Sequence, residues 1–125
     1  DGVMVDDDLL PEQVMVMGFS QGTMMALHVL PRRDEAVAGL VAISGRLLEP
    51  ESLIEQAKCR PPVLLIHGDM DDVVPIDSLP KAAQGLQDAG WDEVYAHVMK
   101  GTGHGIAPDG LQVALAFMAE RLGYA

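Results

Sequence analysis

The sequence has only one cysteine, Cys59, among its 125 residues. A single cysteine can form no internal disulfide and cannot supply the thiolates of a metal site. Basic residues are also scarce, because eight Lys and Arg stand against 19 Asp and Glu and leave a formal net charge of −11. This balance argues against nucleic acid or an anionic membrane surface as the main partner.

Long apolar runs are absent as well. The run at 14–19 is interrupted by Gly18 and the run at 36–43 by Gly39, so both fall far short of the ~18 residues of a membrane span. No basic segment followed by an apolar one opens the chain, and we therefore expect no export signal and a cytoplasmic location. Hydrophobic residues make up 49% and charged residues 22%, which excludes intrinsic disorder.

What the chain does contain is an alternation of short apolar runs with amphipathic stretches, which predicts an α/β fold with a parallel sheet. The predicted strands are 14–17, 39–43, 63–66 and 94–99. The first three are continuously apolar, as in a sheet covered by helices on both faces. The fourth alternates and suits an edge strand with one wetter face. No repeat or linker divides the chain, so residues 1–125 are expected to form one domain.

Helices are predicted between these strands. One covers 21–30 and stops at Pro31, a short one follows Pro50, and another covers 78–89 with Gly90 as its stop. The last helix shows large apolar residues spaced by four, three and four, which predicts that they form its buried stripe. These residues are Leu111, Leu115, Met118 and Leu122.

The sequence G-F-S-Q-G at 18–22 lies between a predicted strand and a predicted helix. A serine on such a sharp turn is held in a strained conformation with its oxygen exposed, and the flanking glycines let strand and helix approach. Ser20 is therefore a candidate nucleophile. The backbone N–H of Gln21, at the start of the helix, is a candidate donor for an oxyanion.

A base and an acid are available in the order that α/β-hydrolases use, which is serine, acid, histidine. The third predicted strand runs into H-G-D-M-D-D-V-V-P at 67–75, and the fourth runs into G-T-G-H-G-I at 101–106. The carboxyl ends of parallel strands meet at one edge of a sheet. His104 and an aspartate of the first segment should therefore come together with Ser20.

These three motifs resemble the phospholipase/carboxylesterase family of α/β-hydrolases, relatives of acyl-protein thioesterases. The resemblance implies that Ser20 is the nucleophile, Asp71 the acid, His104 the base and the N–H of Gln21 an oxyanion donor. The register of the family places the acid four residues after His67. Two residues depart from its usual pattern: Thr23 stands where small residues are common, and Asp72 where proline is frequent.

By the same resemblance, the loop at 44–48 after the second strand helps to line the acyl pocket. Leu47 and Leu48 from this loop, with Val73 and Val74, would favour small to medium, fairly apolar acyl esters. Hydrolysis would proceed through an acyl-enzyme on Ser20, and thioesters are accessible to the same machinery. Neither a cofactor nor a metal ion is expected.

The resemblance covers the C-terminal half of such an enzyme, about four mainly parallel strands with flanking helices. We therefore expect that earlier strands precede this segment in a longer polypeptide or are supplied separately. The strand at 14–17 would otherwise be an open edge, apolar on both faces. Two copies that pair at this edge would form a homodimer with a continuous sheet, which a lysine at Val16 should weaken.

Two other functions remain open from the residues. A strand followed by D-M-D-D-V at 69–73 resembles the D-x-D-x-T/V motif of haloacid-dehalogenase-type phosphatases, in which an aspartate is the nucleophile and Mg²⁺ is bound. The chain could also be a half-hydrolase that binds or assembles without catalysis. Among the remaining histidines, His67 is expected to have a supporting role, and His28 and His97 to be packing or surface residues.

Overall fold

The computed structural model describes residues 14–33, 37–47 and 50–122. Within them, four strands form one sheet in the order β1-β2-β3-β4, and every neighbouring pair is parallel. The α/β fold class predicted from the alternating pattern is therefore confirmed. The strands are β1 Met15–Phe19, β2 Gly39–Ile43, β3 Val63–Gly68 and β4 Val94–Met99.

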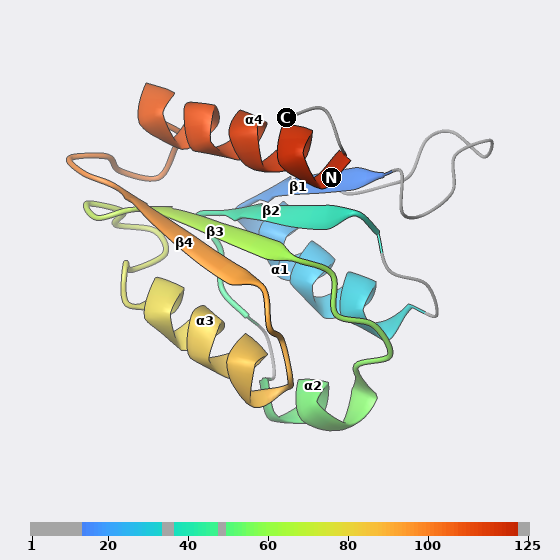
Figure 1. Ribbon diagram of the computed structural model, residues 1–125. Coiled ribbons are helices and arrows are strands. Elements are labelled where there is room, and N and C mark those ends of the chain that lie inside the picture. Colours follow the sequence, from blue (N-terminus) through green and yellow to red (C-terminus); the bar gives the residue numbers. More distant parts are fainter. Residues whose placement is uncertain (1–13, 34–36, 48–49, 123–125) are drawn as a thin grey trace.

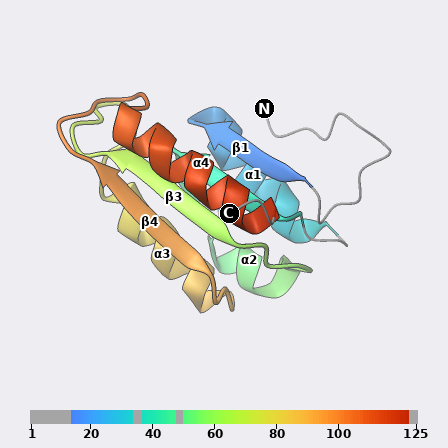
Figure 2. The ribbon, with the colours of Figure 1, turned by 45° about the horizontal axis from the view of Figure 1, so that its top comes forward.

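Helices cover both faces of the sheet in three layers (Figure 1). α1 Gln21–Val29 continues into the short 3₁₀ turn η2 Leu30–Arg32. It lies on the same face as α2 Pro50–Gln56 and α3 Ser78–Asp88. The opposite face carries α4 Pro108–Leu122, which Figure 2 shows lying over the strands. Because both faces are covered, β2 and β3 are buried along their whole length, as expected for continuously apolar parallel strands.

Two apolar clusters fill the spaces between these layers. The larger one packs the α1 and α3 side of the sheet, with Leu27, Leu40 and Leu86 almost completely buried. The smaller one lies under α4 and includes Ile66 and Phe117. Burial of this apolar surface is the main force that fixes the strand ends relative to one another.

The α4 stripe predicted from the sequence is wrong at Leu111 and Leu115, which are 45% and 55% exposed. Met118 is half-buried and packs against the smaller cluster, as predicted, and Leu122 is half-buried. The fully buried residues of the helix are Gly110, Ala114 and Phe117. At Gly110 a Cβ atom would collide with the side chain of Met99, so the helix approaches the sheet through its small residues. The sequence pattern gave weight to large side chains and missed this close approach.

The other differences are smaller. β1 starts one residue later than predicted and runs on to Phe19, and β3 runs on to Gly68, so both strands lead directly into the candidate motifs. α1 ends at Val29 because Pro31 lies in the 3₁₀ turn. β4 is an edge strand, as predicted, but residues on both of its faces are exposed, Tyr95 on one and Val98 on the other.

Candidate active site

Ser20 lies on the sharp turn between β1 and α1. Its backbone has φ 54° and ψ −112°, a conformation that residues other than glycine rarely adopt and that is costly unless the surroundings impose it. The turn is held at both sides, because the Ser20 N–H donates to the Ile43 carbonyl at 2.9 Å and the Ser20 carbonyl accepts from the Met24 N–H at 3.1 Å. The strained position predicted for this serine is present.

The two glycines of the motif are not equivalent. A Cβ atom at Gly18 would lie 2.7 Å from the Thr23 nitrogen and 2.8 Å from the Gly22 carbonyl oxygen, so only glycine lets β1 and α1 meet so closely. A Cβ atom at Gly22 would meet nothing within 4 Å. The expectation that both glycines relieve a steric clash therefore applies to Gly18 alone.

The structure brings together the three side chains expected to form a catalytic array. Nε2 of His104 lies 2.9 Å from the Ser20 hydroxyl, and Nδ1 of the same ring lies 2.8 Å from Oδ2 of Asp71. The strand order accounts for this meeting, because β1, β3 and β4 end at the same edge of the sheet. With Nδ1 donating to Asp71, Nε2 is the nitrogen that can take the serine proton.

The Asp71 carboxylate is enclosed, with its side chain fully buried. Burial raises the pKa of this carboxyl, but hydrogen bonds from His104 and from the N–H groups of Val74 and Val73 outweigh burial, and the net pKa lies below the ordinary value. The two N–H groups reach Oδ1 at 2.8 and 2.9 Å, which leaves Oδ2 for His104. Asp71 is therefore ionised and fixed in direction.

His67 supports Asp71 from the end of β3. Its ring is almost completely buried, and its Nε2 lies 2.7 Å from the Val74 carbonyl and 3.4 Å from Oδ2 of Asp71. A carbonyl oxygen only accepts hydrogen bonds, so Nε2 must carry a proton in this contact. His67 thereby holds the short segment whose N–H groups bind Asp71.

The neighbouring aspartates lie elsewhere. Asp69 and Asp72 are both exposed, and the Asp69 carboxylate accepts a hydrogen bond from the backbone N–H of Gly101. Within the described residues, no three His, Cys, Asp or Glu side chains gather where they could share a metal ion. Of the other histidines, His28 is half-buried in α1, and His97 bonds the Asp109 carboxylate at 2.6 Å.

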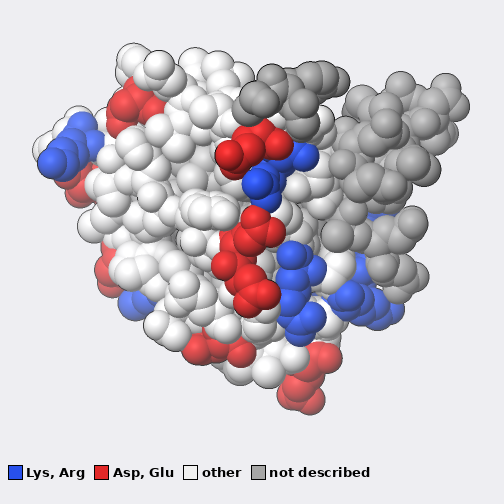
Figure 3. All heavy atoms as spheres, viewed as in Figure 1, with Lys and Arg blue, Asp and Glu red and all other residues white. Residues whose placement is uncertain are grey.

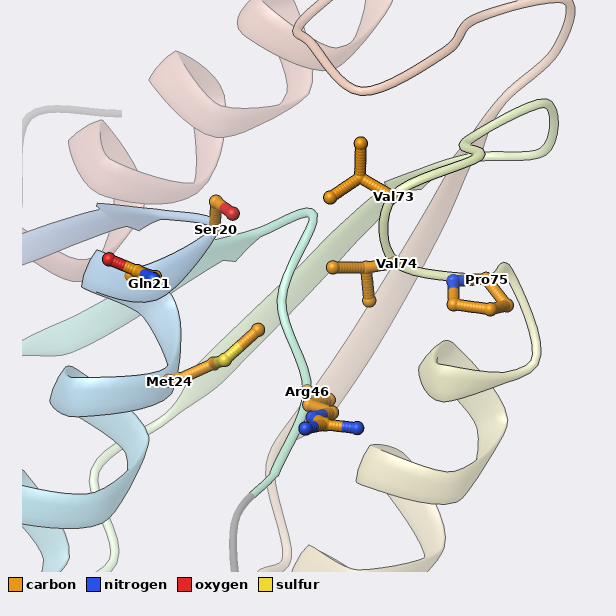
Figure 4. Close-up of a pocket in the computed structure, with 7 residues that line it drawn as sticks. All are labelled: Ser20, Gln21, Met24, Arg46, Val73, Val74 and Pro75. Carbon is orange, nitrogen blue, oxygen red and sulfur yellow. The ribbon is translucent and has the colours of Figure 1, made fainter.

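A pocket of about 320 Å³ opens beside Ser20 (Figure 4). Val74 lines it, as expected, and Gln21 lies at its Ser20 end. Leu47 instead lines a second pocket of about 200 Å³, and Leu48 lies outside the described residues. Met24 and Pro75 also line the pocket and were not predicted from the sequence. For Met24 there was a signal, because the helical spacing from Ser20 to Met24 places these two residues on one face of the helix.

Phe19 is a further contact that the sequence did not predict. Its ring is 44% exposed and packs against His104, with the ring centroids 4.9 Å apart and the planes inclined by 47°. The residue before Ser20 therefore limits the movement of the His104 ring. Only the position of Phe19 inside the G-F-S-Q-G motif could have suggested this contact.

Charged side chains of both signs are distributed over the surface. On the face in Figure 3, most basic side chains lie next to acidic ones. Among the helices that the structure describes, none is long and apolar enough to cross a lipid bilayer.

The chain is similar to several known proteins. The acyl-protein thioesterase 1 of Saccharomyces cerevisiae is 36% identical over 123 residues, which cover 94% of this chain and 54% of that protein. The solved structure of esterase PE8 is 45% identical, with a TM-score of 0.88 over 92% of this chain and 53% of that one. The solved structure of Arabidopsis thaliana SOBER1 is 26% identical, with a TM-score of 0.84 over 91% of this chain and 55% of that one.

The chain thus spans about half the length of the relatives it matches, as the resemblance to a C-terminal half predicted. The model of the phospholipase/carboxylesterase family matches residues 3–122. This range contains Ser20, Asp71 and His104. With four parallel strands arranged as in solved α/β-hydrolases, the chain belongs to the phospholipase/carboxylesterase family of α/β-hydrolases.

Proposed function

We propose that the protein is a serine hydrolase of acyl esters, with Ser20, His104 and Asp71 as its catalytic triad. The observation that carries the proposal is the position of the His104 ring, which is hydrogen-bonded to the Ser20 hydroxyl at 2.9 Å and to the Asp71 carboxylate at 2.8 Å. Relatives named acyl-protein thioesterase and esterase support the same class of reaction.

In the proposed reaction, Oγ of Ser20 attacks the ester carbonyl carbon while its proton passes to Nε2 of His104. Asp71 stabilises the imidazolium that forms. As the bond to the alcohol oxygen breaks, His104 returns the proton to that oxygen, and the acyl group remains on Ser20. Water then attacks the acyl-enzyme by the same proton route, which releases the carboxylic acid and restores the serine hydroxyl.

The backbone N–H of Gln21 is the proposed oxyanion donor. Gln21 is the first residue of α1, and the first N–H groups of a helix have no partner within it. The partial positive charge at this helix end also favours a developing negative oxygen. Ser20 and Gln21 line the same pocket, which supports an oxyanion position close to the attacking oxygen.

Small to medium acyl esters are the proposed substrates, because Met24, Val73 and Val74 provide apolar walls next to Ser20. Thioesters could undergo the same steps. A phosphatase of the haloacid-dehalogenase type is not favoured, because the chain matches the model of a different family and Asp71 is hydrogen-bonded to His104. The expected cytoplasmic location stays a prediction.

We also propose that β1 pairs with another strand in the working protein, supplied either by a preceding segment or by a second copy. β1 lies at one edge of the described sheet, and its residues Met17 and Phe19 are 37% and 44% exposed. The lysine expected to weaken such pairing cannot be placed at Val16, which is 3% exposed inside the core. Met17→Lys is the suitable variant, and sedimentation equilibrium measures its effect on association.

Turnover of p-nitrophenyl esters by the encoded protein, with any segment that precedes residue 1, tests the proposed reaction. Ser20→Ala should abolish turnover above the background rate, because it removes the attacking oxygen while leaving the pocket walls in place. Unchanged turnover in this variant would show that Ser20 is not the nucleophile.

A further inference from the structure

We propose that Arg46 selects substrates that carry an anionic group, a carboxylate or a phosphate, beyond the ester bond. This inference rests on the proposed function, because it places the carbonyl of the substrate at Ser20. It assigns a specificity role to a guanidinium that takes no part in the proton transfers.

The charges around the pocket carry the argument. Arg46 lines both the pocket at Ser20 and the second pocket, where Lys81 is a further cation. Among the described residues that line these two pockets there is no carboxylate, although the chain has 19 Asp and Glu. The pocket is therefore positively charged in a protein whose net charge is −11. An anion should bind more favourably in this pocket than on the rest of the described surface.

The Arg46 guanidinium is also available for a ligand. It makes no hydrogen bond or ion pair within the described part of the chain. By contrast, Arg60 is bonded to the Ala89 carbonyl and Arg121 to the Glu93 carboxylate. A guanidinium offers a planar set of donors that matches carboxylate and phosphate oxygens. Lys81 is less available, because it pairs with Asp77 at 3.2 Å.

The backbone before Arg46 fixes its position relative to the nucleophile. Ser44 directly follows the last residue of β2, beside the Ser20 turn, and its φ of 54° is a strained value. A Cβ atom at Gly45 would lie 2.9 Å from the Ser20 carbonyl oxygen and still closer to the Thr23 side chain. The loop therefore packs closely against the turn that carries Ser20. Arg46 is the first residue after β2 that can extend into the pocket.

The pocket separates the two functional groups. In Figure 4 the Arg46 guanidinium lies away from Ser20, with the side chains of Met24 and Val74 drawn between them. A substrate that reaches both residues would have its ester at Ser20, a short apolar spacer beside Met24 and Val74, and its anion at Arg46. The anion could belong to the acyl part or to the alcohol part, and the two are distinguished by experiment.

Two matched pairs of esters test the proposal in the encoded protein. Mono-p-nitrophenyl glutarate differs from p-nitrophenyl pentanoate by a carboxylate in place of a methyl group on the acyl side. 4-Carboxyphenyl pentanoate differs from phenyl pentanoate on the alcohol side. The ratio of kcat/KM within at least one pair should favour the anion, and Arg46→Gln should lower that ratio by about 10-fold through the loss of charge-assisted hydrogen bonds.

Two control variants accompany this measurement. Arg46→Lys should retain part of the preference, because it keeps the charge but loses the planar donor set. Arg33→Gln also removes one positive charge, but from the end of the η2 turn, outside the pocket, and should leave both ratios unchanged. If Ser20-dependent turnover is present and Arg46→Gln changes neither ratio, the selection by Arg46 is wrong while the proposed reaction stands.

A binding experiment separates the inference from catalysis. In the Ser20→Ala background, calorimetry uses monomethyl glutarate for an anion on the acyl side and 4-carboxyphenyl pentanoate for one on the alcohol side. For at least one of these ligands, the Kd should rise about 10-fold on adding Arg46→Gln. Added salt should weaken the binding as well, because Arg46 is exposed. If the encoded protein shows no ester turnover, this measurement still decides: an unchanged Kd for both ligands would overturn the inference, and a raised Kd for either one would support it.

Discussion

The Asp69 carboxylate ties the loop after β3 to the loop after β4, because its Oδ1 accepts a hydrogen bond from the backbone N–H of Gly101 at 2.8 Å. Two backbone contacts reinforce this connection: the Asp69 N–H donates to the Met99 carbonyl, and the Met70 N–H donates to the Thr102 carbonyl. One of these loops carries Asp71 and the other carries His104. Their connection sets the distance between Asp71 and His104.

Asp69→Ala should therefore lower kcat by about 10-fold while KM changes little, because it loosens the His104 loop without touching the pocket. Asp72→Ala is the matched control, since Asp72 is an exposed aspartate in the same loop. Steady-state kinetics of both variants provide the comparison. Equal effects of the two substitutions would contradict a positioning role for Asp69.

Asp71→Asn should reduce kcat by up to about 10⁴, because an amide can no longer hold the His104 ring in the correct tautomer and stabilise its charge. The lowered pKa of Asp71 keeps the carboxylate ionised through neutral and mildly acid pH, so the loss should be similar across that range. A pH–rate profile of both proteins measures this. A larger loss at Asp72→Asn than at Asp71→Asn would refute the assignment of the acid.

Stability at low pH should also depend on Asp71. Its pKa is lowered in the folded protein, so its ionisation stabilises the fold above the ordinary pKa of 3.8, and this contribution disappears as the pH falls through the folded pKa. As the pH is lowered from about 6 to about 3, the free energy of unfolding measured in urea should therefore fall more steeply for the wild type than for Asp71→Asn. Parallel curves for the two proteins would argue against the lowered pKa.

Thr23 stands where small residues are common in the family, and its side chain connects α1 to β2. Its hydroxyl donates to the Ile43 carbonyl at 2.8 Å and accepts from the Ile43 N–H at 2.9 Å. Thr23→Val should lower the free energy of unfolding by about 1–3 kcal/mol, because it leaves the buried Ile43 N–H without this acceptor. Thr23→Ser, which keeps the hydroxyl, should lose less. Equal losses in denaturant titrations would show that packing, and not the hydroxyl, is responsible.

The position of the site could be predicted from the sequence because each motif follows a continuous apolar run. Ser20, Asp71 and His104 stand at the ends of β1, β3 and β4 or in the loops that follow, and parallel strands bring their carboxyl ends to one edge. The motifs and the apolar runs before them are sufficient to predict this meeting, because the carboxyl ends of parallel strands lie at the same end of the sheet whatever the order of the strands.

The contacts made across space could not be predicted in the same way. The buried face of α4 depends on Gly110 and Ala114 fitting against the sheet, and periodicity gives small residues little weight. Two further observations depend on where separate loops fold back: the packing of Phe19 against His104, and the lack of a partner for Arg46 within the part of the chain that the structure describes. No spacing along the chain encodes these distances.

Labelling with a fluorophosphonate probe tests the central proposal most directly, because the reaction requires the nucleophile, the base and the oxyanion donor together. The encoded protein should form one covalent adduct, which peptide mapping places on Ser20. His104→Gln should slow its formation strongly, and Ser20→Ala should abolish it. An adduct at another residue, or one that persists in Ser20→Ala, would contradict the account.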